Sequence, residues 1–196
     1  MQPSTRDRIR TAATALSAER GLDAVSVRDI AAAVGMKPSN LYAHYPSRDA
    51  LIAELFADGY AEYGALLAEA AAGPGPFAVR LRAMVRLICR LHDEDTTRFR
   101  FLLLAQHGQL ARVGDAVETP VTVLQREVEA AMGRGEIAPG DPALLTAAIV
   151  GIPLQAATFH LYGRLQRSLD ELADDIADAC LAVVTPVLPG APPHER

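Results

Sequence analysis

Side chains that can bind phosphate groups or base edges are concentrated in residues 35–48, which read GMKPSNLYAHYPSR. Phenol, imidazole and guanidinium groups can hydrogen-bond to an anion, and lysine, serine and asparagine can hydrogen-bond to bases. Such side chains also occur in protein cores and in active sites. Which of these three roles they have depends on the helices that position them.

A sharp turn between two short helices is predicted within this stretch. Gly35 ends one helix, and Pro38 suits the first position of the next because its φ is fixed and it lacks an N–H. Pro38 also disfavours helical geometry at Lys37. The second helix is expected over 38–45, since Pro46 follows it.

The helix expected over 38–45 has an inner and an outer side. Leu41 and Tyr45 are four residues apart, so they share a face and are predicted to pack inward. Tyr42 lies between these inward-facing residues and the outward-facing ones. The others point elsewhere: Ser39, Asn40, Ala43 and His44. A helix that projects its polar side in this way can enter a major groove.

Two further helices precede this one, and each begins at a capping signal. Ser4, with Asp7 three residues later, predicts a helix over 5–20, and the same pattern at Ser26 predicts a helix over 27–34. The last two of these three helices are joined by a turn of about three residues, which matches the helix-turn-helix plan.

Apolar residues recur with the 3.6-residue period of a helix along most of the chain, which predicts an all-α fold of about nine helices. Ser47 can cap a long helix that the sequence GPGP at 73–76 ends. A Pro-rich tail over 189–196 is expected to fray. The intervening helices are expected at about 77–92, 97–107, 115–133, 142–166 and 169–185.

Charge is unevenly distributed along the 196 residues. The net charge is −5, but residues 1–50 carry seven basic and five acidic side chains. A positive front favours a polyanionic partner. An excess of two positive charges is equally compatible with ordinary variation in surface charge. The charge distribution alone therefore does not identify a partner. The basic residues are Arg6, Arg8, Arg10, Arg20, Arg28, Lys37 and Arg48.

The sequence lacks the signals of secreted proteins, membrane proteins and enzymes. The first residues, MQPSTRDRIR, lack the apolar stretch of a secretory signal, and we expect no apolar run near the roughly 18 residues of a membrane span, so a cytoplasmic protein is predicted. Gly-rich phosphate loops, H-x-x-x-H pairs and nucleophile elbows are absent, so neither enzymatic activity nor a metal or cofactor is expected. Cys89 and Cys180 lie in apolar patterns and are predicted to be reduced packing residues.

Residues 25–52, VSVRDIAAAVGMKPSNLYAHYPSRDALI, resemble the signature of the TetR/AcrR family of bacterial transcriptional regulators. The resemblance lies in Ser26, Ile30-Ala31, Val34-Gly35, Tyr42-x-His44-Tyr45, and Arg48 before Leu51. The family more often has a smaller residue than Val34, phenylalanine in place of Tyr45 and lysine in place of Arg48. The resemblance implies a helix-turn-helix DNA-binding domain over 1–46 and a helical effector-binding and dimerisation domain over 47–188.

The resemblance also implies two sets of DNA contacts. Backbone phosphates would be bound by Ser26, Tyr42, His44 and Arg48. Bases would be read by Arg28, Lys37, Ser39 and Asn40. Alternatives stay open, because Arg28 could pair with Asp29 or Asp23, and Tyr42 and His44 could serve packing alone.

A homodimer is expected through the helices at 142–166 and 169–185. One seam of the last helix is apolar, with Leu169, Leu172, Ile176, Cys180, Val183 and Val187 at spacings of three and four. The preceding helix is apolar on more than one side, with Leu144, Leu145, Ala148, Ile149, Ile152, Ala156 and Phe159. Two subunits could cover these surfaces in a four-helix interface, or the surfaces could be buried within one subunit.

A ligand pocket among the middle helices is implied by the resemblance, with Arg86, Arg90, Phe101, Gln106, His107, Gln155, Phe159 and His160 as candidates. The implied function is a repressor that leaves a palindromic operator when a small-molecule effector moves the long helix beginning near Ser47. The alternative is an effector-independent DNA-binding protein that acts architecturally or through a protein partner.

Overall fold

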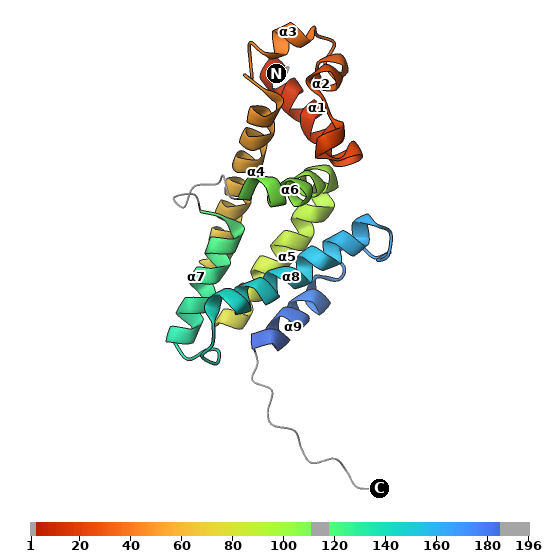
Figure 1. Ribbon diagram of the computed structural model, residues 1–196. Helices are drawn as coiled ribbons and strands as arrows, with labels where there is room; N and C mark the ends of the chain where they lie inside the picture. Colours follow the sequence, from red (N-terminus) through yellow and green to blue (C-terminus); the bar gives the residue numbers. More distant parts are fainter. Residues whose placement is uncertain (1–2, 111–117, 185–196) are drawn as a thin grey trace. The chain divides into compact units, whose positions relative to one another are not determined.

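The computed structural model describes residues 3–110 and 118–184, and all regular elements within these ranges are helical (Figure 1). The predicted all-α fold is confirmed. In chain order the elements are α1 (Thr5–Arg20), the 3-10 helix η1 (Leu22–Ala24), α2 (Val27–Ala33), α3 (Pro38–Leu41), α4 (Arg48–Ala71), α5 (Phe77–Glu94), α6 (Thr96–Gln109), α7 (Pro120–Gly133), α8 (Pro142–Leu161) and α9 (Ala173–Val184).

The chain forms two compact units, and each unit combines two stretches of sequence. The first contains Met1–Leu66 and Leu91–Pro120, and the second contains Leu67–Arg90 and Val121–Arg196. Both α4 and α5 therefore contribute residues to each unit. The division expected from the sequence, after residue 46, is one of function and stays a prediction.

In the first unit, α1 is the helix around which the N-terminal elements pack. It begins at a capping box, in which the Ser4 hydroxyl accepts the Asp7 N–H at 3.1 Å and the Asp7 carboxylate accepts the Ser4 N–H at 3.0 Å. Ile9 and Ala13 are one turn apart and fully buried, and α1 packs against α2 and α6. The predicted cap and the helix over 5–20 are confirmed.

The part of α4 in the first unit has a glycine where another segment approaches closely. A methyl group on Gly64 would lie 2.8 Å from the carbonyl carbon of Glu118 and 3.0 Å from Cα of Thr119. Backbone atoms cannot move aside as the end of a flexible side chain can. Gly64 is therefore required by the residues that lead into α7.

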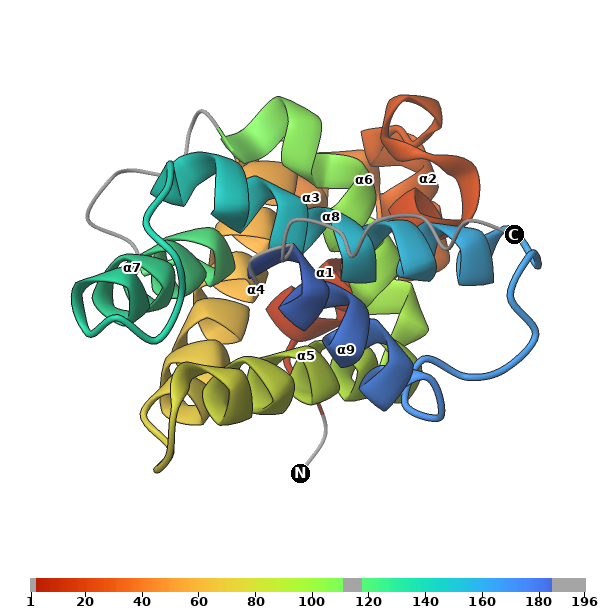
Figure 2. The ribbon, with the colours of Figure 1, turned by 90° about the horizontal axis from the view of Figure 1, so that it is seen from below.

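In the second unit, α8 and α9 pack side by side (Figures 1 and 2). Leu169, Ile176 and Cys180 of the predicted seam are buried there. These three residues are therefore buried within one subunit, which was the alternative to burial in a dimer interface. Val187, the last member of the seam, lies outside the described residues.

Pro153 removes one hydrogen bond from α8 without ending the helix. Proline has no N–H, so the carbonyl of Ile149, four residues earlier, loses its helical donor. The Cys180 thiol of α9 donates to this carbonyl, with the sulfur 3.6 Å from the oxygen. Burial raises the pKa of Cys180 to about 11, so the thiol keeps its proton at neutral pH. The thiol thus takes the place of the missing N–H.

The end of α8 corrects a predicted boundary, because the helix stops at Leu161 and does not continue to residue 166. Gly163 follows with φ 68°, in the left-handed region. Its N–H bonds to the His160 carbonyl at 2.9 Å, and the Arg164 N–H bonds to the Phe159 carbonyl at 2.8 Å. These two bonds form a Schellman motif, which ends a helix at glycine.

The start of the last helix is also corrected. The predicted cap forms, since the Glu171 N–H bonds to the Ser168 hydroxyl at 3.2 Å. The Leu172 N–H then bonds to the Leu169 carbonyl only three residues back, at 3.1 Å, which makes a turn. Regular α-helix begins at Ala173 instead of residue 169.

The composition of α8 corrects the expectation about apolar runs. Pro142–Leu161 is long and apolar enough to cross a membrane, with a mean hydropathy of 1.6. Helices of soluble proteins meet the same criterion, so this one does not establish a membrane span. Only 22% of the apolar window is buried, so most residues of α8 are at least partly exposed.

Replacing Gly64 with alanine should destabilise the protein by about 1–3 kcal/mol, because the added methyl overlaps backbone atoms. Gly108→Ala is the matched control, since no atom lies within 4 Å of a Cβ added there. The control should gain up to about 1 kcal/mol from helix propensity. Urea unfolding followed by circular dichroism measures both. Equal stability of the two variants would contradict the close approach at Gly64.

Candidate nucleic-acid interface

The second predicted capping box fixes the start of α2. The Ser26 hydroxyl accepts the Asp29 N–H at 3.2 Å, and the Asp29 carboxylate accepts the Ser26 N–H at 2.8 Å and the Ser26 hydroxyl. The hydrogen bond from the Ser26 hydroxyl is the main cause that lowers the pKa of the Asp29 carboxyl. The carboxylate is therefore ionised at neutral pH and holds the cap in place.

The turn after α2 is a Schellman motif around Gly35. Its φ of 70° lies in the left-handed region that favours glycine. The Gly35 N–H bonds to the Ala32 carbonyl at 3.1 Å, and the Met36 N–H bonds to the Ala31 carbonyl at 2.9 Å. The residue before Pro38 is extended, as predicted. The two short helices are thus joined by a turn with defined geometry.

The helix after this turn is shorter than predicted, because α3 ends at Leu41 instead of residue 45. Beyond it, the His44 N–H bonds to the Leu41 carbonyl three residues back, at 2.9 Å, which is a tighter turn than an α-helix. Pro46 disfavours helical geometry at residue 45. Residues 38–45, called the recognition segment below, are one helical turn followed by a tight turn.

Burial divides the recognition segment into anchors and outward-facing groups. Leu41 is 0% exposed and Tyr45 is 1% exposed, which confirms both as core residues. Tyr42 is 54% exposed, and His44 is half-buried. The predicted base-reading side chains at the start of the segment are all exposed: Lys37, Ser39 and Asn40.

Most basic side chains of residues 1–50 already have a partner in the chain. Those with a hydrogen bond or an ion pair are Arg6, Arg8, Arg10, Arg20 and Arg48. Arg28 and Lys37 are exposed and form no such bond with the residues that the structure describes. The alternative pairing of Arg28 with Asp29 or Asp23 is thus not observed within 3–110 and 118–184. Both cations are available to an anion.

Two side chains expected to bind phosphate are engaged within the chain itself. Arg48 donates from Nη2 to the Leu22 carbonyl, and its Nη1 lies 3.4 Å from an Asp49 oxygen. The Ser26 hydroxyl donates to Asp29. Both side chains fix the backbone that precedes α2. A phosphate contact by either would require some of these bonds to be exchanged, and it stays a prediction.

Arg8 supports the turn through a bond to a residue far away in sequence. Its Nη2 donates to the Val34 carbonyl at 2.7 Å. Val34 lies at the C-terminal end of α2, where carbonyls lack helical donors. The bond ties α1 to the turn. The two residues are 26 positions apart, so no local pattern could have revealed the contact.

Known proteins share this arrangement. Residues 9–55 match the family of bacterial regulatory proteins called the tetR family. Residues 9–55 are a tetR-family domain. The matched residues run from the buried Ile9 of α1 into α4 and include the whole helix-turn-helix, so the resemblance seen in residues 25–52 is confirmed. No curated protein matches the chain in sequence.

Solved structures with a similar fold cover nearly the full length of the chain. A bacterial regulatory protein of the tetR family from Rhodococcus RHA1 is 21% identical, with a TM-score of 0.80 over 94% of this chain and 98% of that one. The TetR-family regulator PfmR from Thermus thermophilus is 21% identical, with a TM-score of 0.74 over 90% and 98%. The fatty acid degradation regulator FadR from Bacillus halodurans is 16% identical, with a TM-score of 0.75 over 92% and 96%. Identities this low show a shared fold.

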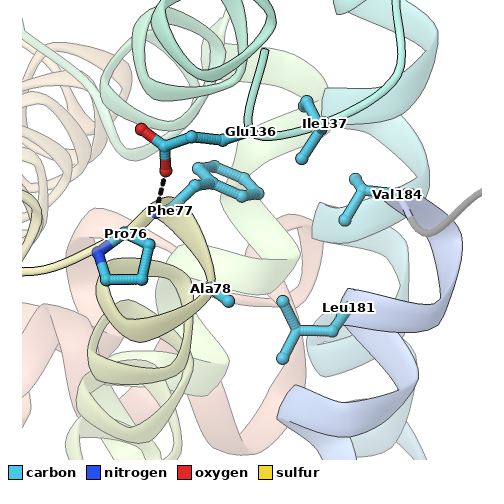
Figure 3. A pocket seen from close by; sticks show the side chains of 7 residues that line it. All are labelled: Pro76, Phe77, Ala78, Glu136, Ile137, Leu181 and Val184. Atoms are coloured by element: carbon cyan, nitrogen blue, oxygen red, sulfur yellow. Dashed lines mark hydrogen bonds between the residues drawn. The ribbon is translucent and has the colours of Figure 1, made fainter. Parts of the chain in front are cut away.

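The second unit contains an apolar cavity of about 210 Å³ (Figure 3). One carboxylate reaches it, from Glu136, and accepts the Phe77 N–H. The lining residues come from the start of α5, the segment after α7 and the end of α9: Pro76, Phe77, Ala78, Glu136, Ile137, Leu181 and Val184. None of the predicted ligand residues is among them.

The predicted ligand residues have varied surroundings. Arg86 pairs with Asp174 at 2.6 Å on the surface. Phe101 is 1% exposed, as expected of a core residue, whereas Phe159 is 42% exposed. The others are half-buried or exposed: Arg90, Gln106, His107, Gln155 and His160. Their role in ligand binding stays a prediction.

Proposed function

We propose that this chain is a cytoplasmic repressor of the TetR family that binds a palindromic operator in double-stranded DNA and is released by a small-molecule effector. TetR-family regulators are generally DNA-binding transcription factors, and we propose no enzymatic activity for this one. The observation that carries the proposal is the pair of exposed cations, Arg28 and Lys37, on the two sides of the Gly35 turn. A guanidinium can bind both acceptors of a guanine, and an ammonium can bind a base or a phosphate.

The proposed DNA contacts divide into two classes. Arg28, Lys37, Ser39 and Asn40 read bases. Tyr42 and His44 bind backbone phosphates, and the 54% exposure of Tyr42 supports this role because it leaves the side chain accessible to DNA. Arg48 and Ser26 contribute to phosphate binding, and they also hold the backbone before α2.

A homodimer is proposed through the helices at 142–166 and 169–185, with the exposed side of α8 at its centre. Exposed residues recur there at spacings of three and four: Leu144, Ala147, Gly151, Gln155 and Phe159. Leu144 is 67% exposed and Phe159 is 42% exposed, so large apolar side chains lie at both ends of this row. The small residues permit close approach of a second α8, and a two-fold axis would pair this surface with itself. Such a dimer would place two recognition segments roughly 34–36 Å apart, one turn of DNA.

Release by an effector is proposed to act through α4. This helix follows the recognition segment directly and contributes residues to both compact units. Effector binding that favours a different position of α4 would therefore alter the spacing of the two recognition segments. Because equilibrium coupling is reciprocal, DNA must weaken effector binding by the same factor.

Arg28→Ala should weaken binding to the preferred duplex by about 1–3 kcal/mol and relax the preference at one base pair. The duplex is first obtained by selection from random DNA, and affinities are measured at several salt concentrations. Arg48→Ala should weaken binding to all DNA sequences by the same factor. It should also reduce the slope of log affinity against log salt concentration by about one unit.

Arg126→Ala is the control for these variants, because it removes an equal charge from α7 and should leave base preference unchanged. Failure of the unaltered protein to enrich any sequence would refute the proposed function. An unaltered base preference in Arg28→Ala would refute only the reading role of Arg28.

Ala147→Arg should convert the dimer to monomer, because a charged side chain placed in an apolar interface would be buried without a partner. Ala83→Arg is the matched control, an exposed alanine on α5. Sedimentation velocity gives the mass of each variant. If Ala147→Arg stays dimeric, the interface does not involve this side of α8.

A metabolite that acts as effector should raise the melting temperature and also release the selected duplex, since a ligand that binds only the folded state stabilises it. The compounds tested should include fatty acids, because one structural relative is named as a fatty acid degradation regulator. Arg28→Ala should still be stabilised by the effector. A library in which no compound has both effects would favour the effector-independent alternative.

A further inference from the structure

The Glu54 carboxylate of α4 is the centre of a group of polar side chains, here called the Glu54 cluster: Arg6, Arg10, Tyr45, Glu54 and Asp58. Arg6 Nη2 lies 2.7 Å and 2.8 Å from the two Glu54 oxygens. Arg10 Nη1 lies 2.6 Å from Glu54, and its Nη2 lies 2.7 Å from Asp58. One guanidinium thus binds two carboxylates on successive turns of α4.

The cluster also includes the end of the recognition segment. The Tyr45 hydroxyl lies 3.5 Å from Glu54 Oε1, and the Arg6 guanidinium lies over the Tyr45 ring, 4.7 Å from its centre. Tyr45 is one of the two buried anchors of that segment. The cluster therefore joins α1, α4 and the recognition segment at one place in the first unit.

Because the cluster is partly exposed, we expect it to position side chains more than to stabilise the fold. The side chains of Arg6, Arg10 and Glu54 are 50%, 26% and 36% exposed. Ion pairs this exposed contribute little to folding stability. Their geometry is nevertheless restrictive, because Glu54 accepts from two guanidiniums and Arg10 donates in two directions. Hydrogen bonding by Arg6 lowers the pKa of Glu54, so the carboxylate is ionised at neutral pH.

We infer that Glu54 is a positioning residue for DNA recognition, which holds Tyr45 and thereby sets the orientation of the recognition segment relative to α1 and α4. The inference rests on the proposed function. Neither Glu54 nor Arg10 touches DNA in this scheme. Both act through Tyr45, and the charges of Arg6 and Arg10 are offset by those of Glu54 and Asp58.

In the variant E54Q, a positioning role and a purely electrostatic role predict opposite changes in DNA affinity. Loss of a negative charge strengthens non-specific DNA binding, whatever the role of Glu54. Loss of positioning weakens binding to the selected duplex. We expect the ratio of specific to non-specific affinity to fall about tenfold, the effect of losing one charged hydrogen bond.

The variant R10K tests the same inference without a change of charge. A single ammonium on a flexible chain cannot reproduce the two directed bonds that a guanidinium makes. Affinity for a random duplex should stay as in the unaltered protein, whereas affinity for the selected duplex should fall several-fold. Because R10K keeps the charge, it decides the matter even if E54Q does not fold.

E62Q is the matched control, because Glu62 lies on the same helix and pairs with Arg98 of α6 at 3.0 Å, away from the recognition segment. It removes the same charge and should leave the affinity ratio unchanged. Melting temperatures and helix content are measured for all variants. An unchanged ratio in folded E54Q and R10K overturns the inference. If the unaltered protein prefers no sequence, the proposed function fails, and this inference fails with it.

Discussion

The orientation of a helix too short to support itself is the constraint on which the N-terminal elements depend. Isolated helices below about 12–15 residues are marginal in water, and α3 has only four residues. Its position therefore comes from what holds it: the buried Leu41 and Tyr45, and the Schellman turn at Gly35. The expected DNA contacts from Lys37 to His44 are attached to backbone that is fixed in this way. Accuracy in recognition is thus a property of the turn and the anchors, and not of helix length.

Local chemistry predicted much of this region, because caps, turns and i to i+4 faces involve residues close in sequence. The capping box at Ser26, the turn at Gly35 and the burial of Tyr45 were all predictable for that reason. Partners distant in sequence were not. Arg8 with Val34 and Glu54 with Arg6 bring together residues 26 and 48 positions apart. Counting charges along residues 1–50 also missed that five of seven cations are engaged, leaving Arg28 and Lys37 available.

Apolar periodicity in the second unit predicted helices well but not what covers them. The seam of α9 and the sides of α8 have the same kind of pattern, although Ile176 and Cys180 are buried against the chain itself and Leu144 is exposed. A periodic row of apolar residues indicates that it will be covered by another surface. It does not indicate whether that surface belongs to the same chain or to a second one. The early end of α8 has a different cause. A single glycine, Gly163, was enough to stop a helix whose composition favoured continuation.

The bond between Cys180 and the Ile149 carbonyl makes two distant positions depend on each other in evolution. While Pro153 is present, replacing Cys180 with an apolar residue leaves a buried carbonyl without a donor. Once Pro153 has become a residue with an N–H, the thiol is no longer needed. The order of substitution therefore matters, and a lineage that loses the proline first can lose the cysteine freely. In related sequences, the identity of the residue at one position should then constrain the residue at the other, although neither takes part in DNA recognition.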